Sequence, residues 1–482
     1  MKKKYGIIAA TIVCCMTLIV GCTGANKAAG GSEGKDQMVQ NETEANAQKE
    51  AGNAAAEPEN MAYISASKLN VRQEPVGSAQ IMAKAPKGSR VEILEEKTDE
   101  AGTLWYKINY KDISGDVQGW IAAEYTVKKL EDLLTGNLKN LDLSPFEKTL
   151  EYEGNPRVKV KGVYVTIHSA AGANLENLIQ LAENTEINAF VVDVKDDLGK
   201  MLFKTNAAEK YAPDANEKAP IKDIKAFTQK LREKNIYLIA RIVSFKDPTY
   251  SNDYPERSIL DKSTGQTFVS SDGLKWVSAY DRELWNYNIE VAKEAADAGF
   301  NEIQFDYVRF PASNGGKMDS KLDYRNTNNE FKPEAIQKYL KFAQEQLSPK
   351  KVYISADVFG LVGSVSDDMG LGQHWEAISN VTDYICPMMY PSHYGSGVYG
   401  LAVPDAKPYE TVYKGTYDSV VRNSNLQTPA TIRPWIQDFT ATWVKGHIRY
   451  GTNEVNLQIK ALNDNGVYEY LLWNAGNRYS IK

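Results

Sequence analysis

From Lys159 onward, short apolar runs alternate with longer segments whose apolar residues recur at helical spacing. Each run has the length of a strand, and each longer segment can return the chain to the same edge of a parallel sheet. The predicted strands are 161–168, 188–195, 236–243, 302–310, 352–360, 383–390, 430–437 and 468–476. The predicted helices are 174–184, 221–235, 281–299, 333–347 and 455–466, with weaker candidates at 373–381 and 409–423.

Strands that alternate with crossover helices over roughly 320 residues predict an α/β fold of the (β/α)8, or TIM-barrel, type. A doubly wound open sheet is the alternative, but no Gly-rich phosphate loop follows a predicted strand. The chain stops soon after the last predicted strand, so an eighth helix is missing from the pattern. The segment from Leu130 to Leu143 is expected to fill that gap.

The remaining sequence divides into four parts before a barrel domain at 157–482. Residues 1–22 predict a leader, discussed below. Residues 23–60 are small and polar, cannot bury enough surface to fold, and predict a disordered tether. Residues 61–127 contain short alternating strands separated by Gly, Pro and Asp, which indicates a small all-β barrel. Residues 128–156 predict a linker with one helix.

The all-β region contains, in this order, Leu69-Asn70-Val71-Arg72, Gly88 before Val91 and Ile93, Trp105-Tyr106, and Gly119-Trp120-Ile121. With these residues the region resembles the bacterial SH3 domain. The resemblance implies a module that binds cell-wall peptides or acts as a spacer. Trp105, Tyr106 and Trp120 could form a ligand groove, or they could pack within the domain.

The first residues indicate export. Lys2, Lys3 and Lys4 precede an apolar run that is too short for an ordinary membrane span. The run ends in Ile19-Val20-Gly21-Cys22, which resembles the bacterial lipobox. The resemblance implies a lipoprotein signal peptide, a lipid such as palmitate on Cys22, and anchoring at the extracytoplasmic face of the membrane. An ordinary secretory signal or an uncleaved anchor is the alternative.

Cysteine usage and charge narrow the possible functions. Once the leader is removed, Cys386 is the only cysteine besides Cys22, so no internal disulfide is expected, and Cys386 is predicted to be a small buried apolar residue. The net charge of -6 argues against a nucleic-acid partner. The four histidines are scattered and no zinc, nucleophile-elbow or Walker motif is present, so neither a metal nor a cofactor is expected.

The fourth predicted strand, within "EIQFDYVRF", places polar side chains on one face. Glu302, Gln304 and Asp306 alternate with apolar residues that suit the helical layer. In a barrel the other face is the interior, where a polar row is costly unless it is hydrogen-bonded or functional. Because catalytic residues lie at the C-terminal ends of barrel strands, Asp306 is a candidate catalytic residue.

The same alternation predicts further inward-facing residues near the other strand ends. These are Tyr164, Thr166, His168, Asp193, Lys195, Arg241, Ser355, Asp357, Met388, Tyr390, Arg433, Trp435, Gln437 and Trp473. Carboxylates, cations and aromatic rings at most strand ends are hard to explain by packing alone.

Glycoside hydrolysis is the chemistry that fits, because it needs two carboxyl groups with different roles. Asp306 is predicted to be the nucleophile or main charge stabiliser, and Asp357 the general acid/base. Asp193 is the rival for the second role, and Asp438 is a weaker one. For each, a structural carboxylate paired with Arg or Lys is the alternative.

Substrate-binding candidates surround these carboxylates. Aromatic faces suit the apolar faces of sugar rings, while cations can hold carboxylates ionised or contact sugar hydroxyls and anionic groups. The predicted set is Arg309, Arg241, Lys195, Tyr390, Trp435, Gln437, Trp473 and His393; for His393, a solvated loop residue is the alternative.

The region from about 159 to 482 contains, in this order, the phrases "KGVYVT", "NAFVVDVKDDLGKM", "IYLIARIVSFKDP", "FDYVRFP", "ADVFG" and "MMYPSHY". With these phrases it resembles a bacterial family described as a putative glycosyl hydrolase domain. The resemblance implies a TIM-barrel glycosidase, which we expect to act on cell-wall or extracellular polysaccharide or on peptidoglycan. The alternatives are a non-catalytic glycan-binding lipoprotein and, less favoured without a metal motif, a deacetylase or lyase.

Overall fold

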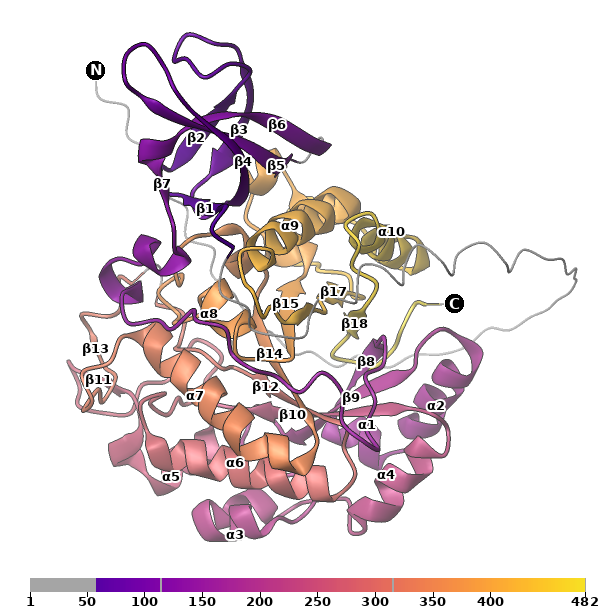
Figure 1. Cartoon of the computed structure of the whole chain (residues 1–482). Helices are drawn as coiled ribbons and strands as arrows, with labels where there is room; N and C mark the ends of the chain where they lie inside the picture. Colours follow the sequence, from indigo (N-terminus) through magenta and orange to yellow (C-terminus); the bar gives the residue numbers. More distant parts are fainter. Residues whose placement is uncertain (1–57, 113–114, 314–315, 482) are drawn as a thin grey trace, which may run out of the picture.

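The computed structural model describes residues 58–112, 115–313 and 316–481. They form a small all-β domain, a connector and a closed α/β barrel (Figure 1). The predicted leader, the predicted lipidation site Cys22 and nearly all of the predicted tether lie outside the described residues. Within the described ranges, no helix combines the length and hydrophobicity that crossing a bilayer requires.

The N-terminal domain is one antiparallel sheet in the order β3-β2-β6-β5-β4-β1-β7. Its strands are β1 (Met61–Ile64), β2 (Lys68–Arg72), β3 (Ile81–Pro86), β4 (Arg90–Thr98), β5 (Leu104–Asp112), β6 (Gly115–Ala122) and β7 (Thr126–Val127). A Cβ at Gly119 would lie 2.7 Å from Val71 Cγ1 and 2.8 Å from Arg72 O, so β6 can cross β2 closely only with glycine there. The predicted all-β domain is confirmed.

The three aromatic residues considered for a ligand groove, Trp105, Tyr106 and Trp120, are buried. Trp105 and Trp120 pack against each other, and Trp105 Nε1 donates to Asp99 Oδ2 at 2.9 Å. Tyr106 belongs to the apolar core of the sheet. These three side chains therefore pack within the domain and do not form an open aromatic groove.

Parallel strands close the barrel in the order β8-β9-β10-β12-β14-β15-β16/β17-β18, and β18 pairs with β8. Their bounds are β8 (Lys161–Val165), β9 (Ala189–Lys195), β10 (Tyr237–Val243), β12 (Glu302–Asp306), β14 (Tyr353–Phe359), β15 (Tyr384–Met389), β16 (Thr431–Ile432), β17 (Trp435–Gln437) and β18 (Tyr470–Trp473). Between β16 and β17 lies Pro434, which cannot donate a backbone hydrogen bond to a ladder. This closure confirms the TIM barrel over the open sheet.

Helices cover the outside of the barrel (Figure 1). They are α1 (Ile167–Ala171), α2 (Asn174–Asn184), α3 (Asn206–Tyr211), α4 (Ile224–Arg232), α5 (Pro248–Asp253), α6 (Arg282–Asp297), α7 (Lys332–Leu347), α8 (Trp375–Ser379), α9 (Pro408–Asn423) and α10 (Thr452–Asn463). A short antiparallel pair, β11 (Leu260–Asp261) and β13 (Leu322–Asp323), projects from the loops.

The first barrel strand is shorter than predicted. Thr166 caps α1 by accepting a hydrogen bond from Ser169 N, and His168 is exposed on that helix. The prediction that Thr166 and His168 continue the strand and face the interior is therefore wrong. The Thr166 hydroxyl satisfies a free helix N–H, which ends the strand at Val165.

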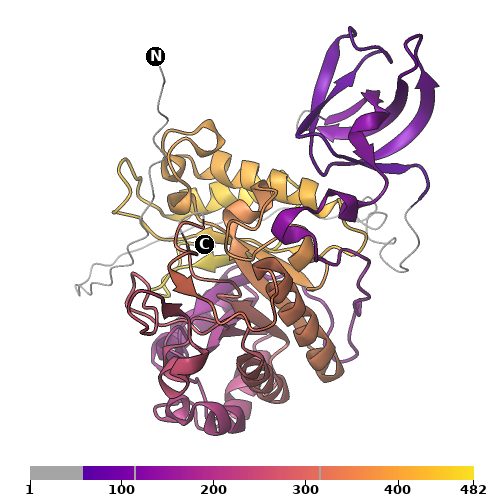
Figure 2. The same ribbon diagram turned by 90° about the vertical axis from the view of Figure 1, so that its left-hand side faces the viewer.

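The connector does not form the predicted helix, and it does not fill the gap left by the missing eighth helix. It has two 3-10 turns, η2 (Leu130–Leu133) and η3 (Gly136–Leu138), and it runs along α7 and α8 (Figure 2). Leu141 and Leu143 pack against Ala377 of α8, and Gln337 of α7 exchanges hydrogen bonds with the backbone of Asp142. Its leucines thus cover the middle of the helical layer instead of replacing an eighth helix.

The end of the connector closes the N-terminal mouth of the barrel. Tyr152 and Val160 join the interior apolar cluster. Arg157 lies 4.5 Å from the Tyr353 ring and donates to Asp383 at 2.7 Å. With this end sealed, a substrate can reach the interior residues only from the C-terminal ends of the strands.

Candidate active site

The interior row of β12 has the predicted orientation. Glu302 accepts two hydrogen bonds of 2.8 Å from Arg433, and Gln304 donates to Cys386 Sγ at 3.4 Å, so Cys386 is buried as expected. Asp306 ends the row and is 6% exposed. Of this polar row, Asp306 is the member nearest the open end.

Arg241, on β10, joins three carboxylates. Its Nε and Nη2 donate to Asp306 Oδ2 at 3.0 and 2.6 Å, and its Nη1 donates to Asp193 Oδ1 at 2.6 Å. Nη2 also donates to Asp197 Oδ1 at 3.0 Å. The guanidinium is fully buried, and these carboxylates raise the pKa of Arg241 despite that burial. Asp306 and Asp193 are therefore fixed at the barrel mouth by one cation.

A sharp turn follows Asp306. Tyr307 has a left-handed φ of 49°, and its N–H donates to Asp306 Oδ1 at 2.5 Å. A non-glycine residue in this region stores backbone strain, which recurs at functional sites. Both oxygens of Asp306 are thus held by donors.

Asp357 lies beside Asp306 on the neighbouring strand. Phe305 pairs with Ala356, so the next residues, Asp306 and Asp357, sit side by side on strands about 4.8 Å apart. Asp357 Oδ1 accepts from Trp435 Nε1 at 2.7 Å. Burial, reinforced by the charge of Asp306, raises the pKa of Asp357 well above its usual range. Burial therefore favours the protonated form of Asp357, next to a carboxylate held by a guanidinium.

Asp193 has a different environment. It accepts hydrogen bonds from Tyr164 and Arg241, and burial outweighs both, so the pKa of Asp193 rises to about 7. Tyr164 in turn stacks on Trp473 at 4.1 Å between ring centroids. Asp193 is thus part of the carboxylate cluster, as the sequence indicated, and is half protonated near neutrality.

Aromatic rings lead outward from this cluster. Tyr390 lies 6.4 Å from Trp473 and 6.0 Å from Phe439, and Phe439 stacks on Trp443 at 6.0 Å. Trp443 is 62% exposed, whereas Tyr390 is buried. Exposed His393 packs edge-on against Tyr390 at 5.2 Å, and its Nδ1 is 2.9 Å from Ser392 Oγ. Such a series of rings can support successive sugar units.

Lys195 does not face the interior. Arg241 pairs with Asp193 but Ile242 pairs with Lys195, so Val194 is an extra residue and β9 has a bulge. The side chain of Lys195 consequently turns to the helical layer, where Nζ contacts Asp247 at 2.8 Å and Asn288 at 2.6 Å. The predicted inward orientation of Lys195 is wrong because the bulge reverses the alternation.

Two other residues predicted to bind substrate already use their polar groups in hydrogen bonds within the protein. The Trp435 indole donates to Asp357, and Trp435 is buried. The side-chain amide of Gln437 donates to Asp405 and to Phe439 O, and its oxygen accepts from Ser392 N. These residues shape the wall of the site. Asp438, the weaker acid candidate, is bound by Ser480 N at 2.7 Å.

Asp197 and Lys246 are site residues that the sequence reasoning missed. Lys246 Nζ donates to Asp197 at 2.9 Å and to Asp272 at 3.4 Å. Although burial opposes it, Arg241 and Lys246 lower the pKa of Asp197 to about 2. The bulge brings Asp197 to the mouth, and the only signal was its position two residues after a strand in "VKDDLGK".

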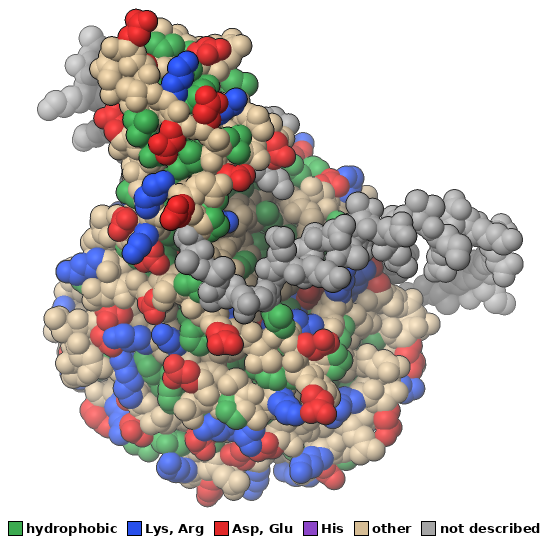
Figure 3. Space-filling view, in the orientation of Figure 1, with side chains coloured by type: hydrophobic (Ala, Val, Ile, Leu, Met, Phe, Trp, Pro, Cys, Tyr) green, Lys and Arg blue, Asp and Glu red, His purple; other side chains and the backbone are tan. Residues whose placement is uncertain are grey.

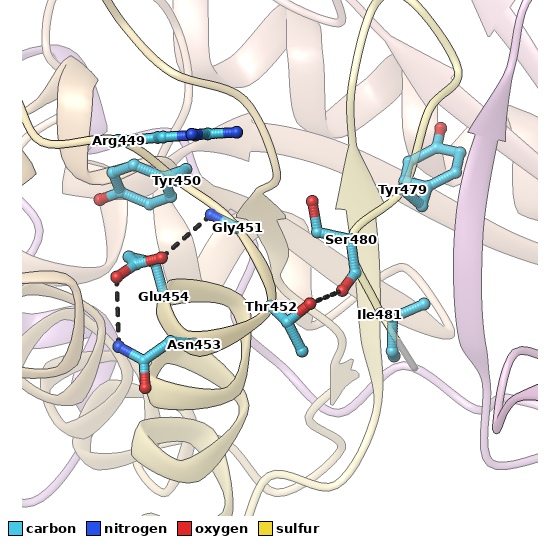
Figure 4. Close-up of a pocket in the computed structure, with 9 residues that line it drawn as sticks. All are labelled: Arg449, Tyr450, Gly451, Thr452, Asn453, Glu454, Tyr479, Ser480 and Ile481. Atoms are coloured by element: carbon cyan, nitrogen blue, oxygen red, sulfur yellow. Dashed lines mark hydrogen bonds between the residues drawn. The ribbon is translucent and has the colours of Figure 1, made fainter. Parts of the chain in front are cut away.

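Other surface features lie apart from this cluster. A hollow of about 560 Å³ at the start of α10 is lined by Arg449, Glu454, Tyr479 and their neighbours, none of them a candidate carboxylate (Figure 4). Basic and acidic side chains are interspersed over the barrel face that Figure 3 shows. Among the described residues, no three His, Cys, Asp or Glu side chains are grouped to hold a metal ion.

Comparison with known families matches both folded parts of the chain. Residues 162–479 match the family described as "Putative glycosyl hydrolase domain", and residues 67–127 match "Bacterial SH3 domain". No curated protein matches. The two family models together span the all-β domain and the barrel.

Similar solved structures include a hypothetical protein from Ruminiclostridium thermocellum, with 32% identity over 43% of this chain and 98% of that chain and a TM-score of 0.36. The glycoside hydrolase domain of PgaB from Bordetella bronchiseptica has 12% identity, covers 65% of this chain and 94% of its own, and has a TM-score of 0.47. The spore cortex-lytic enzyme SleL from Bacillus megaterium has 11% identity, covers 67% and 73%, and has a TM-score of 0.41.

Proposed function

Because the chain belongs to the family described as a putative glycosyl hydrolase domain, we propose that it is a glycosidase that cleaves cell-wall or extracellular polysaccharide with two carboxyl groups. One observation carries the proposal. Asp306, held by Arg241, lies next to Asp357, whose burial favours its protonated form. A proton donor beside an anion is the pair that glycoside cleavage requires.

In the proposed reaction, Asp306 attacks the anomeric carbon while Asp357 gives its proton to the departing glycosidic oxygen. The ionised Asp357 then takes a proton from water, which attacks the glycosyl–Asp306 ester and releases the sugar. Retaining enzymes place the two carboxyl groups about 5 Å apart, close to the spacing of about 4.8 Å between adjacent strands. Arg241 positions Asp306, and Trp473 and Tyr390 provide faces for sugar rings.

We place this activity at the outer face of the membrane. The apolar leader ending in Gly21-Cys22 supports a lipid anchor on Cys22, and the polar residues after it support a flexible tether. The bacterial SH3 domain supports a cell-wall partner. This domain contacts the barrel at Asn425, after α9, where Tyr63 OH and Arg90 N both donate hydrogen bonds.

The direct test measures reducing ends released from purified cell walls and a panel of bacterial exopolysaccharides. The comparison protein is the double variant Asp306→Asn/Asp357→Asn. We expect release from at least one polymer by the wild type alone. If neither protein releases sugar but both sediment with one polymer, the protein is a glycan-binding lipoprotein and the hydrolase proposal fails.

The pH profile distinguishes the two candidate acids. A general acid must be protonated, so kcat/KM falls as the pH rises through its pKa. With Asp357 as the acid, we expect the fall to lie well above the usual titration range of an aspartate and to be unmoved in Asp193→Asn. A fall centred near pH 7 that disappears in Asp193→Asn would instead assign the proton donor to Asp193, whose pKa is about 7.

A further inference from the structure

Arg309 is a buried cation at the barrel mouth whose hydrogen-bonding capacity is mostly unused. The residue is 9% exposed, and Nη1 donates to Phe310 O at 2.9 Å. Its other two nitrogens, Nε and Nη2, donate to no described residue. Neither nitrogen is fully enclosed by the protein, so both keep some contact with solvent. The Nε/Nη2 edge of the guanidinium is therefore accessible.

The neighbouring cations at the mouth have carboxylate partners. Arg241 binds three aspartates, and Lys246 binds Asp197 and Asp272. Arg309 forms no ion pair within the part of the chain that the structure describes. A guanidinium removed from water without a counter-ion is unfavourable, so its retention here points to an anion that arrives with the substrate.

Aromatic rings fix the position of this guanidinium. It lies 4.8 Å from the ring centroid of Trp276, 5.1 Å from that of Tyr307 and 4.7 Å from that of Phe359. Tyr307 directly follows Asp306, and Phe359 comes two residues after Asp357. Arg309 therefore sits between the ends of the two strands that carry the proposed catalytic pair.

We propose that Arg309 binds a carboxylate on the sugar beside the scissile bond, so that the substrate is an acidic glycan. This inference rests on the proposed function and adds the substrate class. The Nε/Nη2 edge matches the two oxygens of a carboxylate, and Arg241 uses the same edge to bind Asp306. The carboxylate belongs either to a uronic acid or to the lactyl group of N-acetylmuramic acid.

Polymer pairs that differ only in the carboxylate test the inference. The substrates are hyaluronate, which carries glucuronate, and peptide-free glycan strands of peptidoglycan, each beside a counterpart whose carboxylates are reduced to alcohols. We expect the wild type to cleave one native polymer about 10- to 100-fold faster than its reduced form, the effect of one charged hydrogen-bonded contact. Arg309→Gln should lose that preference, and Arg309→Lys should keep part of it.

The matched control is Arg257→Gln. Arg257 also lies over a tyrosine ring, 4.5 Å from the centroid of Tyr254, but it ends η5 (Pro255–Arg257), outside the carboxylate cluster. This variant should keep the wild-type preference. Equal cleavage of native and reduced polymers by the wild type, or an unchanged preference in Arg309→Gln, would overturn the inference.

A binding measurement separates this inference from the proposed activity. Free glucuronic acid and N-acetylmuramic acid are titrated against the full chain by tryptophan fluorescence, with glucose and N-acetylglucosamine as neutral probes. We expect a saturable change with one acid only, absent in Arg309→Gln and in Trp276→Phe. Binding of the acid without any cleavage would reject the hydrolase but keep the acidic subsite. Cleavage without a preference for the acidic polymer would keep the hydrolase and reject the acidic subsite. The absence of both binding and cleavage would reject both proposals.

Discussion

Replacing Asp306 with Asn is expected to lower kcat for glycan cleavage by about 10³-fold or more, as removal of a nucleophile does in other hydrolases. Asn has nearly the same shape and can still accept a hydrogen bond from Arg241, so the barrel mouth should keep its geometry. It cannot form the glycosyl ester, and it does not stabilise a positive anomeric carbon. The measurement is initial-rate kinetics on the polymer identified by the reducing-end assay, together with sedimentation to show that binding is retained.

The control for this variant is Asp197→Asn. Asp197 also accepts a hydrogen bond from Arg241, but the proposed reaction gives it no covalent role. We expect Asp197→Asn to reduce kcat far less than Asp306→Asn does. Equal losses in the two variants would mean that the charge balance around Arg241 matters, and that Asp306 is not the nucleophile.

The sequence was sufficient to place most of this cluster because strand alternation is a strict geometric rule. Asp193, Arg241, Asp306 and Asp357 each lie on an interior face, as their positions in apolar strands predicted. The β12 row was the clearest case, since no helical layer would accept three polar side chains in succession. The barrel itself follows from the same alternation of strands and helices.

The alternation fails where a strand is irregular, and a bulge leaves no mark in the residue pattern. One extra residue at Val194 turns Lys195 outward and brings Asp197 to the mouth. Both residue types are equally plausible on either face, so only the pairing register shows which side each occupies.

The connector and the wall of the site show a second limit of prediction from sequence. There, contacts with residues distant in sequence decide what each side chain does. The leucines of residues 130–143 fit a helix by spacing, yet they pack along α7 and α8 through contacts that the local sequence does not specify. Likewise Trp435 was a plausible sugar platform, but its indole N–H is bound to Asp357, 78 positions away.

Replacing Arg241 with Leu is expected to lower the free energy of unfolding by about 3–5 kcal/mol at neutral pH, the usual cost of leaving a buried ionic partner uncompensated. Arg241 is fully buried, and Asp193 and Asp306 would both lose their cation. Without it, the folded-state pKa of Asp193, already raised to about 7 by burial, should rise further above its unfolded value. Ionisation of such a carboxyl group destabilises the folded state as the pH rises from about 4. The loss of unfolding free energy caused by Arg241→Leu should therefore be smaller at pH 5 than at pH 8. Urea unfolding at both pH values measures it.

Arg433→Leu is the matched control for this prediction. Arg433 is equally buried in the same barrel, but it binds Glu302 and Glu469 near the sealed end. Its loss should destabilise the fold by a similar amount, while molecules that remain folded should keep the wild-type KM and kcat. Arg241→Leu should impair both stability and catalysis, because its partners include the proposed nucleophile. If folded Arg241→Leu retained full activity, the position of Asp306 would not depend on this ion pair, and the positioning role of Arg241 would be rejected.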